Sequence, residues 1–208
     1  MTTNIVNISE SHNRWGKRRQ VSKEECLFDL KKDLPKFFLA YNRGVKKYNK
    51  ITSMFRPESK VRFDATVLNT SIIESLQEVF PDRWKWGKYK RFVLKLGDYI
   101  FLVKKFKNNN KPMNIKTKHV NSISNQMSLS LFDSDIYQDD PILFFGYKVD
   151  RMGEVISPQI VYIDEDNVKW IVSENDVNVV RNEINTKVST NEAKVYIKED
   201  MIRKVSNQ

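Results

Sequence analysis

Apolar residues recur at helical spacing through the first part of the chain. Ser22 to Glu25 (Ser-Lys-Glu-Glu) has the form of a capping box, which predicts a helix that begins there. Pro35 interrupts the apolar face of this helix, so we expect a second helix to follow. The second helix carries an aromatic and apolar stripe typical of a buried face: Phe37, Phe38, Tyr41, Val45 and Tyr48. Residues 51–65 are predicted to be a loop or a short extended piece.

The hydrophobic period changes from helical to alternating after residue 80. Up to there, residues 67–80 predict a third helix. Residues 89–96 and 99–106 predict two strands, and Gly97-Asp98 between them has the glycine-first pattern of a type II′ hairpin turn. A short helix is predicted over 115–126, followed by a three-strand meander over residues 142–149, 158–163 and 168–172.

This order of elements predicts the fold class and the division of the chain. Helices first and strands later indicate an α+β fold, with N-terminal helices packed on one antiparallel sheet of about five strands, the hairpin plus the meander. We expect a flexible basic arm over 1–20, a single domain over 21–175, and a C-terminal extension over 176–208 with a weak helix and a last strand at 194–198.

Composition excludes several classes of protein. The 208 residues include 24 aromatic residues, which is too much ring area for a disordered chain. One cysteine and two histidines exclude a disulfide framework and a four-ligand zinc site. No apolar stretch is long enough for a membrane span, and no signal peptide is recognisable, so we expect a cytoplasmic protein that does not bind membranes. Glycine-rich phosphate loops and hydrolase motifs are also missing, and we expect neither a cofactor nor a metal.

The net charge of +10 is unevenly distributed. Residues 83–118 hold twelve bases and one acid, a net +11, whereas residues 133–166 hold nine acids and two bases, a net −7. Such runs are often no more than solvated faces. The functional interpretation of the basic segment is a surface for a polyanion.

Positive charge alternates with aromatic rings between Arg83 and Arg91. Lysine and arginine neutralise phosphates, and exposed rings stack on unpaired bases, so the pattern predicts a nucleic-acid surface. The alternative is that Trp84 and Trp86 anchor a helix-to-sheet junction in the core. The predicted binding residues are Arg83, Trp84, Lys85, Trp86, Lys88, Tyr89, Lys90, Arg91, Lys95, Lys105, Lys116 and Lys118.

Catalytic signals are sparse. His119 follows Lys116-Thr117-Lys118, the single place where the residue types of a metal-free ribonuclease meet, and it is a weak catalytic candidate. Acidic residues spaced as in metal nucleases fall in predicted helices or loops, so no metal site is assigned. We therefore expect a binding protein rather than an enzyme.

The order of features from Phe92 to Trp170 carries a resemblance. A hairpin ending in Val103-Lys104-Lys105-Phe106, then Asn114-Ile115-Lys116-Thr117, Gln126, Phe145-Gly146-Tyr147 and a last strand with Trp170 resembles a group of uncharacterised bacterial, phage and prophage proteins. That group has no assigned activity, so the resemblance implies a mobile-element setting rather than a reaction. It also implies a polar pocket at one end of the sheet, formed by Asn114, Thr117 and Gln126 beside Lys105. The alternative is that Asn114 and Thr117 cap the short helix.

Together these patterns lead to one functional hypothesis and two alternatives. The first is a non-catalytic, nucleic-acid-associated protein of a phage or mobile element, acting through a basic aromatic surface. The second is an inhibitor or antitoxin-like, anti-defence protein whose basic patch meets an acidic protein. The third is a small metal-independent ribonuclease toxin. The basic aromatic pattern fits DNA and RNA alike, whether single-stranded or duplex.

Overall fold

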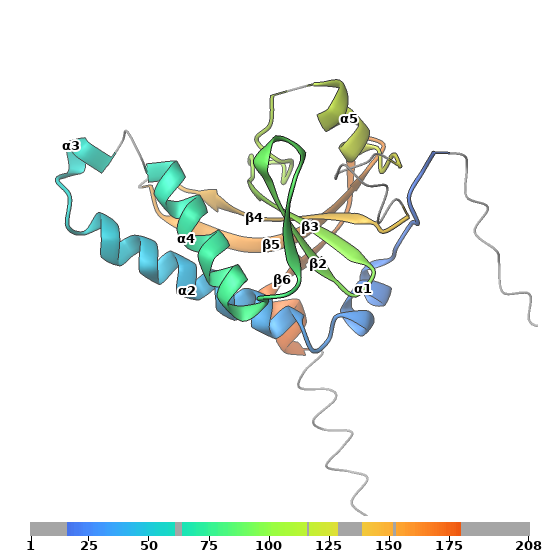
Figure 1. The fold of residues 1–208 in the computed structure, drawn as a ribbon, viewed down its shortest axis with the longest axis horizontal. Coiled ribbons are helices and arrows are strands. Elements are labelled where there is room, and N and C mark those ends of the chain that lie inside the picture. Colours follow the sequence, from blue (N-terminus) through green and yellow to red (C-terminus); the bar gives the residue numbers. More distant parts are fainter. Residues whose placement is uncertain (1–15, 61–63, 116, 129–138, 152, 180–208) are drawn as a thin grey trace, which may run out of the picture.

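Helices precede strands along the chain. The computed structural model describes residues 16–60, 64–115, 117–128, 139–151 and 153–179. The helices are α1 (Lys23–Asp29), α2 (Leu34–Thr52), α3 (Pro57–Lys60), α4 (Asp64–Val79) and α5 (Lys118–Ser124). The strands are β1 (Trp84–Gly87), β2 (Arg91–Leu96), β3 (Tyr99–Lys105), β4 (Ile142–Val149), β5 (Val155–Asp164) and β6 (Asn167–Ser173), with a 3-10 turn η1 (Lys88–Lys90) between β1 and β2. This arrangement confirms the predicted α+β fold (Figure 1).

The six strands form one sheet in chain order, from β1 at one edge to β6 at the other. Neighbouring strands are antiparallel except β3 and β4, which run parallel from the pair Ile100 and Ile142 to the pair Lys105 and Tyr147. The sheet thus differs from the predicted one in two details. β1 adds a strand before the hairpin, and the long crossover through α5 makes the central pair parallel.

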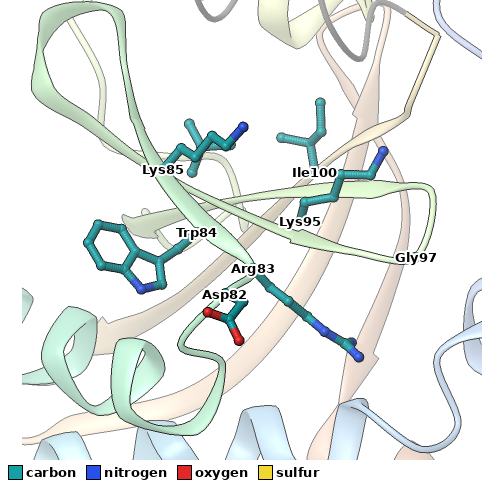
Figure 2. A pocket seen from close by; sticks show the side chains of 8 residues that line it. Asp82, Arg83, Trp84, Lys85, Lys95, Gly97 and Ile100 are labelled. Carbon is teal, nitrogen blue, oxygen red and sulfur yellow. The ribbon is translucent and has the colours of Figure 1, made fainter.

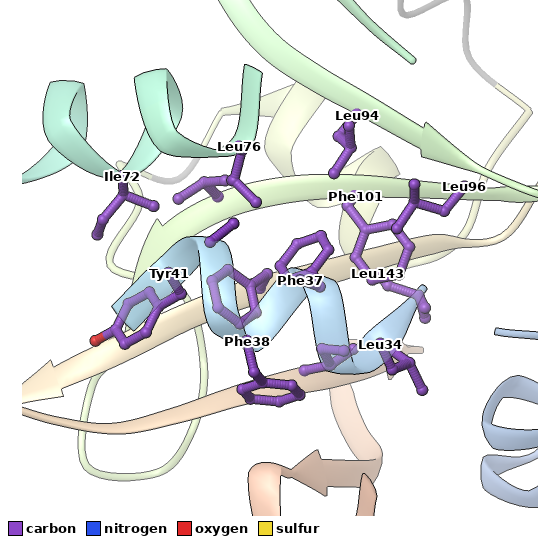
Figure 3. Packing of buried hydrophobic residues seen from close by; sticks show 14 of the residues in the cluster. Leu34, Phe37, Phe38, Tyr41, Ile72, Leu76, Leu94, Leu96, Phe101 and Leu143 are labelled. Carbon is purple, nitrogen blue, oxygen red and sulfur yellow. The ribbon is translucent and has the colours of Figure 1, made fainter. Parts of the chain in front are cut away.

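The main core lies between one face of this sheet and the two long helices. Figure 3 shows α2 directing Leu34, Phe37 and Phe38 among sheet residues such as Phe101 and Leu143. The Phe37 ring centroid lies 5.0 Å from that of Phe101, an aromatic contact that adds to simple burial. The predicted aromatic stripe of α2 is therefore a core face.

Two glycines permit close backbone approaches. A Cβ atom at Gly44 would lie 2.7 Å from Cα of Ile72, so the absence of a side chain lets α2 contact the backbone of α4. At the parallel pair, a Cβ atom at Gly146 would lie 1.8 Å from the carbonyl oxygen of Lys104. Both positions require glycine because the opposing atoms belong to the backbone and cannot move aside independently.

A smaller apolar cluster lies on the opposite face of the sheet, where α5 packs. Ile123 of α5 is buried against side chains of β2, β3, β4 and β5 and of the residue that follows β3. These are Val93, Ile100, Leu102, Phe106, Ile142, Phe144, Val161 and Ile163. The hydroxyl of Thr117 accepts a hydrogen bond from the backbone N–H of Val120 at 3.2 Å. Thr117 is thus the N-cap of α5, as one of the two interpretations predicts.

The chain just before α1 is fixed to the sheet. Arg18, in the segment predicted to be a flexible arm, is 2% exposed, and its guanidinium donates to the carbonyl oxygens of Met127 at 3.1 Å and Asp140 at 2.8 Å. Burial lowers the pKa of Arg18 to about 10, an effect that Asp140 and Asp139 oppose. The described residues 16–20 therefore differ from the predicted arm, while residues 1–15 lie outside the described part.

The remaining local predictions have mixed outcomes. The Ser22 hydroxyl accepts from the Glu25 N–H at 3.1 Å, and Gly97 has φ +54° with a two-residue turn between Leu96 and Tyr99, so the helix start and the hairpin are confirmed. In the segment predicted as a loop over 51–65, α2 runs on to Thr52 and α3 forms. The strand predicted at 194–198 lies outside the described residues. Within the described ranges no helix is long and apolar enough to cross a membrane.

Candidate nucleic-acid interface

β1 and β2 form a hairpin of their own, distinct from the β2–β3 hairpin with the Gly97 turn. The residues Trp86–Arg91 join β1 to β2 in an unusual backbone conformation and are here called the hairpin tip. Tyr89 (φ 61°, ψ 32°) and Lys90 (φ 53°) both have left-handed backbones, although neither is glycine. The turn is closed by the Arg91 N–H, which donates to the carbonyl oxygen of Lys88. A left-handed conformation costs a non-glycine residue about 1–2 kcal/mol. Such local strain is typical of sites under functional constraint.

Aromatic side chains at and beside the hairpin tip divide into anchored and exposed rings. Trp84 is half-buried and packs against the main core, which favours the structural interpretation for this residue. Trp86 is 53% exposed and is braced by edge contacts to Trp84 at 6.1 Å and to Phe92 at 5.9 Å. Tyr89 is 84% exposed and contacts the ring of His119 edge-on at 5.9 Å. Two rings are therefore held in place yet open to solvent.

A broad groove of about 870 Å³ runs between this tip and α4. Such a volume falls within the range of about 300–1,000 Å³ that is usual for ligand sites. The wall formed by α4 is mostly small and polar, whereas the opposite wall is basic and aromatic: Trp86, Tyr89, Lys90, Arg91, Phe92, Lys104 and Lys105. In Figure 1 the β1–β2 hairpin (dark green) rises beside α5, and α4 lies on its other side.

The lysine and arginine residues of the +11 segment, residues 83–118, separate into those that form ion pairs and those that do not. Three form ion pairs that hold the fold: Arg83 with Asp33 at 2.9 Å, Lys95 with Asp140 at 2.7 Å, and Lys111 with Asp166 at 3.3 Å. No carboxylate of the described residues pairs with the others around the tip, which are Lys85, Lys88, Lys90, Arg91, Lys104, Lys105 and Lys118. Positive charge without a partner is thus concentrated at the hairpin tip and the end of β3.

A second, smaller hollow of about 260 Å³ lies at the other end of the hairpin. Figure 2 shows Lys85 of β1 and Lys95 of β2 beside Ile100, with Arg83 and Asp82 below them. Two of its three cations, Arg83 and Lys95, are engaged in the ion pairs above. This hollow therefore offers less free charge than the hairpin tip.

His119 lies within the cationic region rather than apart from it. Its Nε2 atom is 2.8 Å from Nη1 of Arg91. Burial, with the charges of Arg91 and Lys88, lowers the pKa of His119. Burial likewise lowers the pKa of Arg91 and that of Lys104, the latter further lowered by the Arg91 charge. No role was predicted for Lys104, and the signal in the sequence that points to it is its place in the basic run of residues 83–118.

The predicted polar pocket is not assembled. Gln126 is fully buried, and its side-chain amide hydrogen-bonds to the backbone of Ile142 and Ile163. Ile142 is the first residue of β4 and pairs with Ile100 near the start of β3. Asn114 instead lies beside Arg91 and Lys104, toward the other end of β3. Thr117 is used as the helix cap, and Lys116 lies outside the described residues. Gln126 is a structural residue and does not join Asn114 in one site.

Other chemistry has little support in the described part of the chain. It holds no group of three His, Cys, Asp or Glu side chains placed to bind a metal ion. Cys26 is buried in α1, and burial, aided by Asp29 and Glu25, raises its pKa to about 12. A thiol with so high a pKa is a poor nucleophile near neutral pH.

Comparison of the chain with protein-family models, curated proteins and solved structures found no match. The resemblance to bacterial, phage and prophage proteins therefore stays a prediction.

Proposed function

We propose that this protein binds single-stranded nucleic acid, without cleaving it, at the hairpin tip and along the groove toward α4. The observation that carries the proposal is the pair of exposed rings, Trp86 and Tyr89, set among cations that have no acidic partner in the described residues. Unpaired bases stack on such rings, whereas the bases of a duplex are already stacked on one another.

The free cations supply affinity that is independent of sequence. Lys85, Lys90 and Lys105 are exposed, and Lys88 and Arg91 are half-exposed beside them. Five phosphate contacts to a single strand would give a slope of about −3.5 in a plot of log affinity against log salt concentration. No described acid forms an ion pair with any of these five residues.

The rigidity of the tip favours binding. The Arg91 to Lys88 hydrogen bond closes the turn, Phe92 and Trp84 brace Trp86, and His119 supports Tyr89. Rings that are already fixed lose less conformational entropy when a base stacks on them. The strained backbone thus has a functional explanation, because it presents the Tyr89 ring to solvent.

Fluorescence anisotropy with labelled single-stranded and duplex DNA and RNA, over a series of salt concentrations, tests the proposal. We expect single strands to bind more tightly than duplexes, with a steep salt dependence. Each of Trp86→Ala and Tyr89→Ala should weaken binding about 5- to 150-fold, the range set by about 1–3 kcal/mol per stacked base. Phe28→Ala is the matched control, because Phe28 is a 68% exposed ring on α1, outside the tip.

Two results would contradict the proposal. Equal affinity for duplex and single strand, unaffected by loss of either ring, would remove stacking from the mechanism. The absence of binding at low salt would reassign the tip to an acidic protein partner.

A further inference from the structure

Two cationic side chains, Arg91 and Lys104, meet the imidazole of His119 beside α5. Arg91 of β2 and Lys104 of β3 lie close enough for the Arg91 charge to lower the pKa of Lys104. Both side chains line the same small cavity under α5, and His119 contacts Arg91 at 2.8 Å. β2, β3 and α5 thus each contribute one member of this cluster, here called the Arg91 cluster.

The cluster is electrostatically unfavourable as it stands. Arg91 and Lys104 are half-buried, and burial lowers the pKa of both, because it disfavours the charged form. The charge of Arg91 lowers the pKa of Lys104 further. No described carboxylate pairs with Arg91 or Lys104, so the compensating charge is missing from the described part of the chain.

The contact with Arg91 defines the state of His119. A guanidinium group donates hydrogen bonds and accepts none, so Nε2 of His119 accepts, and the neutral ring carries its proton on Nδ1. The groups that face the ring are Arg91 from β2 and Lys88 and Tyr89 from η1. All the charged ones are positive, and an anion placed among them would favour the protonated imidazole.

We propose that the Arg91 cluster binds the terminal phosphate of a nucleic-acid strand whose bases stack on the hairpin tip; this rests on the proposed function above. A terminal phosphomonoester carries nearly two negative charges at neutral pH, whereas an internal phosphodiester carries one. The doubly charged group matches a site that two cations line together. Arg91 also supplies the planar donor pair that suits a phosphate.

The position of the phosphate follows from the two cavities that these residues line. The cavity under α5 has a volume of about 10 Å³, barely enough for one water molecule and too small for a phosphate. Arg91 and Lys104 also line the large groove, beside Tyr89 and Lys105. The phosphate therefore lies on the groove side, next to the exposed tyrosine ring.

The test compares one oligonucleotide sequence in three forms: 5′-phosphorylated, 3′-phosphorylated, and with hydroxyl groups at both ends. We expect one phosphorylated form to bind the wild-type protein about tenfold or more tightly than the hydroxyl form. Lys104→Gln should abolish this preference, so that the phosphorylated and hydroxyl forms bind that variant with equal affinity. Lys107→Gln, which removes an exposed lysine two residues after the end of β3, should keep the preference.

NMR titration of His119 provides an independent readout. Its imidazole signals are assigned by their loss in His119→Gln, and its pKa should rise when the preferred phosphorylated oligonucleotide binds. Equal affinity of the three forms with no change in the His119 pKa would overturn the terminal-phosphate site. If the hydroxyl form still required Trp86 and Tyr89, the proposed function would stand alone. Binding of none of the three forms would overturn both proposals. An equal rise with inorganic phosphate, without any preference among the oligonucleotides, would overturn the assignment to a strand end.

Discussion

Gln126→Met offers a direct measure of how strongly one buried side chain holds the sheet together. Gln126 is fully buried, and its Nε2 donates to the carbonyl oxygens of Ile142 at 2.8 Å and Ile163 at 2.7 Å. Its Oε1 accepts from the backbone N–H of Ile142 at 2.9 Å. Methionine has a similar length and volume but replaces none of these three bonds.

The expected loss follows from the groups left without a partner. A buried N–H that loses its only acceptor costs about 1–3 kcal/mol, and each lost bond to a carbonyl oxygen costs about 0.5–1.5 kcal/mol. The free energy of unfolding should therefore fall by about 2–6 kcal/mol, a large share of the 5–15 kcal/mol typical of a folded domain.

Urea denaturation followed by tryptophan fluorescence measures this loss, with Asn125→Ala as the neighbouring control. Among the described residues the Asn125 side-chain amide bonds to the Asn121 carbonyl oxygen alone, so that variant should change the free energy of unfolding by no more than about 0.5–1 kcal/mol. A Gln126→Met protein within 1 kcal/mol of wild type would refute the structural role. Folded Gln126→Met should bind oligonucleotides as wild type does, because Gln126 lies outside the proposed interface.

Three further predictions address the charge, the helix packing and the pH response. Reversal of three lysines at and beside the hairpin tip should abolish oligonucleotide binding in anisotropy, whereas a charge-matched reversal on and just before α2 should leave part of it; the two triple variants are Lys85→Glu, Lys88→Glu, Lys90→Glu and Lys32→Glu, Lys36→Glu, Lys46→Glu. Gly44→Ala should lower the free energy of unfolding in urea by about 1–3 kcal/mol, since its Cβ would lie 2.7 Å from Cα of Ile72; an unchanged value would mean that α2 and α4 can separate freely. The pKa of His119 is lowered in the folded state, so the unfolded chain takes up the proton first as the pH falls below about 6.5, and stability is lost in that direction. Between pH 7.5 and 5.5 the melting temperature of wild type should therefore fall more than that of His119→Gln, and equal falls would contradict the shifted pKa.

The local elements were predictable because their signals are contained in a few adjacent residues. The Ser22 cap and the glycine-first turn at Gly97 depend on neighbouring side chains and backbone angles. β1 was not predicted because its four residues are too few for a clear strand signal, although the alternation of Trp84, Lys85 and Trp86 is itself the period of a strand. The parallel pairing of β3 with β4 depends on a crossover of more than thirty residues, which no local pattern specifies.

The candidate interface was predictable in composition but not in detail. Sequence located the basic and aromatic residues, yet it could not separate Arg83 and Lys95, which form ion pairs with distant acids, from Lys90, which does not. Those partners, Asp33 and Asp140, are brought near only by the fold. Burial likewise separates Trp84 from Trp86, two residues apart on the same strand face.

The parallel contact between β3 and β4 divides the sheet into two meanders, β1–β3 and β4–β6, each made of strands that are neighbours in the chain. Pairing within a meander closes only a short loop, whereas joining the two meanders must close the whole crossover, and long loops slow folding. We therefore expect each meander to form early and the join between them to limit the folding rate. Gly146 lies on that join, where a Cβ atom would meet the Lys104 carbonyl oxygen. An alanine there would block the last step of folding while leaving both halves able to form.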